Sequence, residues 1–211
     1  MKLYKRLAVI LAGSVMAVGF SSTWAYYSDT QSIVNPFHTT NSSIDMVEDF
    51  NPADTILPGE TIDKKPYFVN TGDTELILRL QMETYWADKE TGKRLETLST
   101  DMVQLNYPES FGENWVAITT NGEQYYYYTH ILKGTGEDGS QTSNFLESLT
   151  LAPEVSNDEH AEDYSIGKFI VDFNAEAIQA DQASLAVSGW GLTPLASGVN
   201  QLHWKNLIPI S

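Results

Sequence analysis

The dipeptide Asn121-Gly122 limits what this chain can fold into more than any other short feature. It lies between two runs rich in apolar and aromatic residues, 114–119 (NWVAIT) and 124–132 (QYYYYTHIL). Asn-Gly accepts the positive φ angles of the tightest hairpin turn, so the two runs are predicted to be neighbouring antiparallel strands. The hairpin is the first indication of a β-rich domain.

Other segments add to this prediction. In 76–86 (LILRLQMETYW), Leu, Leu, Leu and Met at even positions alternate with Ile, Arg, Gln and Glu, which makes it the strongest core strand. Pro58-Gly59 predicts a type II turn ahead of it. The segment 175–186 has a helix-friendly composition, yet it could also extend the strand before it. Further strands are predicted at 43–50, 61–70, 145–151 and 167–174. About eight short strands with turn signals between them indicate an all-β, jelly-roll-like β-sandwich.

The first 25 residues have the three parts of a secretory signal peptide, which would form an N-terminal signal helix. Lys2, Lys5 and Arg6 are its charged region, and 7–18 (LAVILAGSVMAV) is its apolar core. Small residues at positions 23 and 25 predict cleavage between Ala25 and Tyr26. The alternative is an uncleaved anchor, although the apolar core is shorter than the roughly 20 residues of a transmembrane helix. Secretion is therefore expected.

The 211 residues are enough for one ordinary domain, and the chain is strongly acidic. Its formal net charge is −16, and removal of Lys2, Lys5 and Arg6 with the signal changes it to −19. Nucleic acids and anionic membrane surfaces need cationic partners, so neither is expected to bind. The chain has no cysteine, which excludes disulfides and thiolate metal sites.

No pattern of catalytic, metal-binding or cofactor-binding residues occurs, and we expect neither an enzyme nor a cofactor. The four histidines, His38, His130, His160 and His203, are far apart and show no HExxH spacing. The tyrosine run 125–128 has two interpretations. Tyr126 and Tyr127 could stack on a glycan. Alternatively, the run could simply place two rings on each face of a strand, one pair in the core and the other on the wet side. The second interpretation is favoured.

Several motifs, in order along the chain, resemble a known family. The junction Trp24-Ala25-Tyr26-Tyr27-Ser28-Asp29 is similar to the boundary cleaved by the SipW-type signal peptidase of Gram-positive bacteria, whose substrates include the TasA and camelysin-like matrix proteins. The body resembles the BsaA-type biofilm matrix proteins. The matching motifs are Leu57-Pro58-Gly59, Tyr67-Phe68-Val69-Asn70-Thr71-Gly72, Leu78-Arg79-Leu80, Trp115, Asn121-Gly122, Tyr125 to Tyr128 and Ala175-Glu176-Ala177-Ile178-Gln179-Ala180.

The resemblance covers roughly residues 1–181 and implies a secreted structural protein of the extracellular matrix or cell surface. It implies pilus-like fibres, in which the N-terminal segment of one subunit completes the sheet of the next by donor-strand exchange. Self-assembly, a SipW-type peptidase, other matrix proteins and polysaccharide are the implied partners. The camelysin branch has been linked to protease activity, but no zinc-ligand pattern occurs here.

On this basis the chain divides into four parts. Residues 1–25 are the signal peptide, 26–40 the donor segment, 41–181 the β-sandwich domain, and 182–211 a C-terminal extension of unknown role. Tyr27, Ile33, Val34 and Phe37 are the side chains expected to fill a neighbour's groove. Apolar and polar residues alternate poorly in this segment. It could instead be a disordered leader or pair with its own sheet. The alternative function is a monomeric secreted glycan-binding module.

Overall fold

The computed structural model describes residues 25–34, 44–48, 55–155, 163–180, 190, 192–198 and 201–206. Within them the chain is predominantly β, as expected for an all-β protein. The strands are β1 (Ala25–Val34), β2 (Ile44–Val47), β3 (Thr55–Ile56), β4 (Thr61–Asp63), β5 (Tyr67–Asn70), β6 (Leu76–Asp88), β7 (Val103–Asn106), β8 (Trp115–Thr120), β9 (Glu123–Tyr128), β10 (Ser148–Leu151), β11 (Gly167–Gln179), β12 (Leu192–Gly198) and β13 (Gln201–Asn206). The expected signal helix, and most of its cleavage motif, lie outside the described residues.

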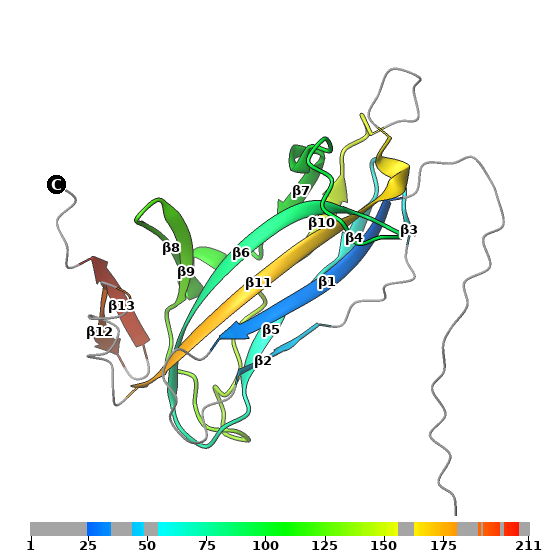
Figure 1. Cartoon of the computed structure of the whole chain (residues 1–211). Helices are drawn as coiled ribbons and strands as arrows, with labels where there is room; N and C mark the ends of the chain where they lie inside the picture. The colour runs from blue at the N-terminus through cyan, green and yellow to red at the C-terminus, as the bar shows by residue number, and fades with distance from the viewer. Residues whose placement is uncertain are drawn as a thin grey trace, which may run out of the picture.

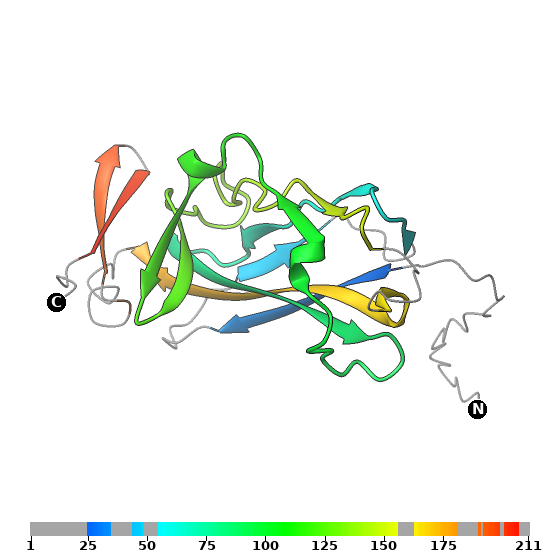
Figure 2. The ribbon, with the colours of Figure 1, turned by 90° about the horizontal axis from the view of Figure 1, so that it is seen from above.

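One long, curved sheet organises the described chain (Figure 1). It has six strands in the order β3-β1-β11-β6-β9-β8. Its spine is the antiparallel pair of β6 and β11, which are 13 residues long and pair along their whole length. Smaller sheets, β4-β10-β7 and β2-β5, lie on one side of the long sheet (Figure 2). The C-terminal strands β12 and β13 form a separate hairpin.

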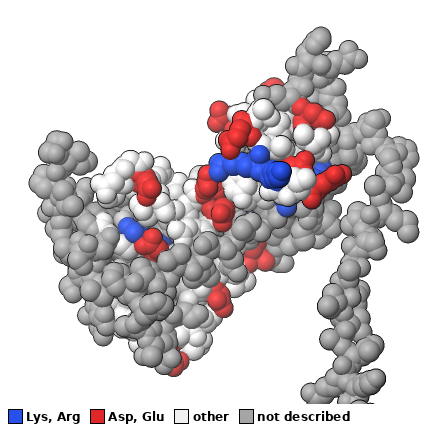
Figure 3. Space-filling view, in the orientation of Figure 1, with Lys and Arg blue, Asp and Glu red and all other residues white. Residues whose placement is uncertain are grey.

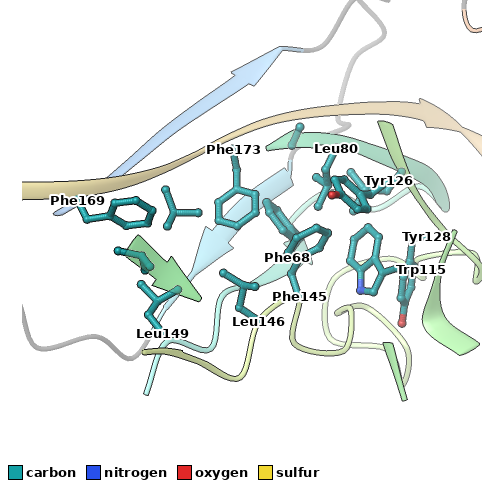
Figure 4. Packing of buried hydrophobic residues seen from close by; sticks show 14 of the residues in the cluster. Phe68, Leu80, Trp115, Tyr126, Tyr128, Phe145, Leu146, Leu149, Phe169 and Phe173 are labelled. Atoms are coloured by element: carbon teal, nitrogen blue, oxygen red, sulfur yellow. The ribbon is translucent and has the colours of Figure 1, made fainter. Parts of the chain in front are cut away.

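The core fills the space between the long sheet and these smaller sheets. Phe173 from β11 contacts Phe68 from β5 and Phe145 edge-on, with ring centroids 5.7 and 5.3 Å apart (Figure 4). Trp115 from β8 packs against Phe145 and Tyr128. Aromatic pairs in these geometries add about 0.5–1.5 kcal/mol each beyond the burial of their surface. The core therefore packs β8, β9 and β11 of the long sheet against β5 and Phe145.

The predicted turns are confirmed. Asn121 and Gly122 have φ angles of 55° and 86°, as a two-residue hairpin between β8 and β9 requires. Gly59 has a φ of 85°, and the Glu60 amide donates to the Leu57 carbonyl at 2.9 Å. Both turns form where the sequence places a residue that tolerates a positive φ.

Two predicted elements differ from the structure. The single strand predicted at 61–70 is two strands, β4 and β5, which belong to different sheets. The break falls at Lys64–Pro66, where proline has no N–H to offer a ladder. The segment from Ala175 to Gln179 is the end of β11 rather than a helix, because it pairs with the first five residues of β6.

Candidate assembly site on the long sheet

The segment predicted to be the donor forms strand β1 in the long sheet of its own chain. β1 runs parallel to β11, with nine residue pairs in register from Tyr26–Lys168 to Val34–Glu176. Its first two residues, Ala25 and Tyr26, also pair with Ile56 and Thr55 of β3. Of the alternatives, pairing with its own sheet is therefore the arrangement in the isolated chain.

The register places the predicted donor residues opposite buried parts of β11. Tyr27 lies opposite Phe169 and Ile33 opposite Ala175, and both partners are 1% exposed. Val34 lies opposite Glu176, whereas Phe37 is outside the described residues. The predicted cleavage bond, between Ala25 and Tyr26, lies within the paired start of β1.

β11 depends on β1 for one of its two hydrogen-bonding edges. Its other edge pairs with β6 through all 13 residues. One face of β11 places Phe169, Val171 and Phe173 in the core, each no more than 1% exposed. Removal of β1 would leave nine residues of backbone unpaired beside these side chains. An open edge of this kind accepts an extended strand, which supplies both ladder hydrogen bonds and apolar contacts.

The opposite face of the long sheet carries a buried cluster around Arg79 of β6. Its guanidinium donates two hydrogen bonds to Oε2 of Glu176 on β11, at 2.7 and 3.0 Å. The side chains of this ion pair are only 9% and 16% exposed. The guanidinium also lies over the rings of Tyr125 and Trp190, 4.1 and 4.7 Å from their centroids. Because Glu176 is the last residue of β11 that pairs with β1, the cluster fixes that end of the paired segment.

The four tyrosines of β9 divide between the two faces as predicted. Tyr126 and Tyr128 lie in the core, while Tyr125 and Tyr127 lie on the face of the Arg79 cluster. The expectation that this second pair would be wet is wrong for Tyr127, which is 0% exposed beside Trp190. Burial raises the pKa of Tyr127, and burial with a hydrogen bond to Glu123 raises that of Tyr125 to about 12.

This burial argues against the glycan interpretation of Tyr126 and Tyr127. A sugar stacks on an exposed ring face, but Tyr126 is 9% exposed and Tyr127 is 0% exposed. Tyr126 contacts Phe111 and Phe145 edge-on, and the hydroxyl of Tyr127 accepts a hydrogen bond from Arg79 at 3.3 Å. Both rings serve the packing of the sheet.

A polar recess of about 420 Å³ lies beside the Arg79 cluster. Its lining combines Met82 with amides and carboxylates from β6, β9 and β11: Gln81, Glu83, Glu123, Gln124, Asp172 and Asn174. Glu83 is already paired with Arg94, and Glu123 accepts from Gln81 and Tyr125. Within the described ranges, no group of three or more His, Cys, Asp or Glu side chains is placed to hold a metal ion.

Two of the four histidines, His130 and His203, lie among the described residues. His130 contacts the ring of Tyr128 and the hydroxyl of Thr129, at 3.0 Å from its Nδ1. His203 is in β13, while His38 and His160 lie outside the described residues.

Two ion pairs of the structure were missed from the sequence. Arg79–Glu176 joins residues 97 apart in the chain, and Lys64–Glu48 is buried with side chains 1% and 5% exposed. Lys64 bonds both carboxylate oxygens of Glu48, at 2.7 and 2.9 Å. Alternation along β6 places Arg79 on the face opposite Leu78 and Leu80. Its partner Glu176 can be identified only from the tertiary structure.

Taken together, the fold and this edge define a β-rich domain whose N-terminal strand completes its own long sheet. No family model, curated protein or solved structure matches the chain. Among the residues described here, no helix has both the length and the apolar character needed to cross a membrane.

Proposed function

We propose that this protein is a secreted structural subunit of an extracellular biofilm matrix fibre, a jelly-roll-like β-sandwich that polymerises head to tail by donor-strand exchange. The observation that supports the proposal most is the place of β1 in the long sheet. It is an N-terminal strand held against the open edge of β11 by nine register pairs. A neighbour's strand of identical sequence could form the same ladder in its place.

In the exchange, β11 keeps the same contacts with a β1 strand, but that strand comes from a neighbouring subunit. An incoming strand satisfies the same backbone groups of β11 as the chain's own β1, so the isolated chain and the polymer differ little in local structure. Donation from one subunit to the next is a heterologous contact that does not close on itself, so it generates an open filament. In the isolated chain, β1 then occupies the edge of β11 until the β1 of another subunit replaces it.

Export and cleavage fit this scheme. The signal segment 1–25 would direct secretion, and a SipW-type peptidase would cut between Ala25 and Tyr26 at the start of β1. Cleavage would free the strand from the membrane so that it can reach another subunit. The fibre would lie in the matrix or at the cell surface, with other matrix proteins or polysaccharide around it.

Deletion of residues 26–40 tests the assembly segment. The intact mature protein should form fibres in negative-stain images, and the truncated protein should form none because it has no strand to donate. The truncated protein should also unfold at a lower temperature, since the edge of β11 is left open. Fibres from the truncated chain would overturn the proposal.

Mixed cysteine variants test exchange itself, because the chain has no cysteine of its own. Ser32 and Asn174 are partners in the β1–β11 register. Neighbouring strands are about 4.8 Å apart, which is within disulfide range. Fibres grown from a mixture of Ser32→Cys and Asn174→Cys chains should give disulfide-linked dimers containing one chain of each kind.

The control replaces the second partner by Asp138→Cys, in an exposed loop away from β11. This mixture should give few linked dimers. If the first mixture also stays unlinked in fibres, while a chain carrying both Ser32→Cys and Asn174→Cys links to itself, β1 remains in its own sheet and exchange is wrong.

A further inference from the structure

Strand β8 (Trp115–Thr120) is the last strand of the long sheet, at the edge opposite β1 and β3. It pairs with β9 on one side only among the residues that the structure describes. Figure 1 shows the β8–β9 hairpin extending from the body of the molecule. The long sheet therefore has a second edge, which the proposed strand exchange does not use.

The hairpin ladder shows which backbone groups of β8 point outward. The Thr129 amide donates to the Asn114 carbonyl at 2.9 Å, so these two residues form a hydrogen-bonded pair. In an antiparallel ladder every second pair is bonded, which assigns Val116, Ile118 and Thr120 to bonds with β9. The N–H and C=O groups of Ala117 and Thr119 then face away from the sheet. The C=O of Trp115 does so too, whereas its N–H donates to the Phe111 carbonyl at the end of the short helix α1 (Phe111–Asn114).

This edge lacks the usual protection against strand pairing. Edge strands normally carry a charge, a proline or a bulge that blocks a partner, yet β8 (WVAITT) has neither a charged residue nor a proline. Ala117 and Thr119 are exposed, and the six residue pairs with β9 run without a bulge. β-branched residues fill most of the strand, which favours extended pairing.

The sequence of β8 is complementary to itself in an antiparallel arrangement. A two-fold axis at Ala117 would place Ala117 opposite its own copy and Val116 opposite the copy's Ile118. Thr119 would face Trp115, and no charged residue of either strand would face another. Apolar β-branched pairs of this kind stabilise a sheet through contacts between facing side chains.

Electrostatics also favours this edge as a contact between copies. Acidic side chains are spread over the face seen in Figure 3, and most of the basic ones lie beside acidic neighbours. With a net charge of −16, two copies repel over most of their surface. β8 is free of charge, and Glu113 and Glu123 flank it beyond its two ends.

We propose that β8 is a self-association surface, on which β8 of a second copy pairs antiparallel about a two-fold axis at Ala117. The contact joins two six-stranded sheets into one continuous sheet. A single contact of six residues is weak, but repetition along a filament multiplies it, so fibres of the proposed kind would align side by side. The pairing of two chains does not itself depend on strand exchange.

Cysteine trapping tests the pairing. Bonded pairs across an antiparallel ladder have Cα atoms about 5.5 Å apart, a distance that a disulfide spans. Under mild oxidation, purified Ala117→Cys should form a covalent dimer on a non-reducing gel, far more than the loop variant Asp138→Cys. Equal amounts of dimer from both variants would contradict the proposed pairing.

Proline substitution distinguishes the role of the outward N–H groups of β8 from that of the N–H groups that bond to β9. Ala117→Pro removes an outward N–H and no bond to β9, so it should keep the fold and weaken dimer formation about tenfold or more, because both chains lose a donor. Val116→Pro removes a bond to β9 and should lower the unfolding temperature instead. Ala117→Lys places like charges opposite each other and should also weaken the dimer.

Sedimentation velocity measures the dimer, and negative-stain imaging shows fibres and fibre bundles. Loss of dimer or of fibre bundles in both Ala117 variants, with single fibres retained, supports the β8 contact. Bundles or dimers unchanged in folded Ala117→Pro and Ala117→Lys would overturn it, as would pairing of β8 with a different strand. Absence of fibres from the unsubstituted protein would count against strand exchange alone.

Discussion

At the scale of single residues, the long sheet is held by polar contacts as well as by its apolar core. Arg79 and Glu176 form a largely buried ion pair between β6 and β11, and Arg79 also lies over two aromatic rings. Trp190 donates to the same Glu176 oxygen at 3.1 Å. One guanidinium thus links β6, β9, β11 and the chain at residue 190.

Removing the charge of Arg79 should destabilise the fold strongly. Arg79→Met keeps the length of the side chain but leaves the Glu176 carboxylate buried without its cation. Breaking a buried pair in this way costs about 3–5 kcal/mol, and the cost here should be near the lower value because both side chains retain some exposure. Urea denaturation followed by tryptophan fluorescence measures the change.

Arg94→Met is the matched control. Arg94 lies beyond the end of β6 and pairs with Glu83 of β6, with side chains 42% and 58% exposed, and it also lies over the ring of Tyr85. Exposed pairs contribute roughly 0–1 kcal/mol, so this variant should lose little stability. Similar losses of stability in Arg79→Met and Arg94→Met would show that burial of the Arg79–Glu176 pair does not increase its contribution to stability.

The tyrosines beside Arg79 should make the fold sensitive to alkali. Burial raises the pKa of Tyr127, and that of Tyr125 is raised to about 12. Both are above the ordinary value near 10, so the folded state holds these protons more tightly than the unfolded state. Their contribution to stability is complete below about pH 10 and is lost as the pH rises towards 12.

The expected result is a fall in the free energy of unfolding above about pH 10, measured by urea denaturation at several pH values. Tyr127→Phe should show a shallower fall because it has no phenol to ionise at that position. An equally steep fall in Tyr127→Phe would assign the alkaline loss to other groups.

At the scale of elements, the turn sequence of the β8–β9 hairpin favours the same strand pairing that the long sheet contains. Gly122 has a φ of 86°, a conformation that side chains with a Cβ adopt only at a cost. The strands on either side meet in a six-pair ladder that carries Trp115 and Tyr128 into the core. The turn therefore sets the register of residues far from it.

Gly122→Ala should destabilise the protein by about 1 kcal/mol. The reason is the backbone angle alone, because an added Cβ would meet nothing within 4 Å. Gly112→Ala is the control, since a Cβ there also has open space and the φ is not positive. Thermal unfolding of both variants should show a loss only for Gly122→Ala. An equal loss in both would mean that turn strain is not the cause.

At the scale of the whole molecule, acidity opposes association. A net charge near −16, or −19 without the signal segment, gives every copy the same sign. Salt screens such repulsion, since the Debye length falls from about 30 Å at 0.01 M to about 8 Å at 0.15 M. Assembly of the purified protein should therefore be faster at the higher ionic strength, as measured by light scattering.

A matched comparison separates screening from strand pairing. Lys89 and Lys93 lie in the region between β6 and β7, and replacing both by Gln makes the chain more acidic without altering β1 or β8. This variant should assemble more slowly at low salt and nearly normally at high salt. Assembly that slows as salt is added would contradict a repulsive barrier.

What could be predicted from the sequence was local. Asn121-Gly122 and Pro58-Gly59 specified turns, because few residues accept the φ angles that those turns need. Alternation in 76–86 specified a strand with one apolar face, and the structure places Leu76, Leu78 and Leu80 in the core. The division of the four tyrosines between two faces followed from the same two-residue period.

The tertiary structure decided how these pieces meet. Residues 175–179 have a composition that favours a helix, yet pairing with the start of β6 makes them a strand. The short strands β3 and β7, and the hairpin of β12 and β13, gave no signal that was recognised from the sequence. Likewise, burial of Tyr127 depends on Trp190, which is 63 residues away in the chain but adjacent in space.

By itself, the sequence determined the β class, the principal turns and the acidity of the molecule, all of which depend on residues and their near neighbours. Only the tertiary structure determined that β1 joins β11 in parallel, that Arg79 meets Glu176 and that β8 is left at an edge. Those features depend on contacts between distant segments, and their free energy comes from burial and pairing that exist only once the sheet has formed.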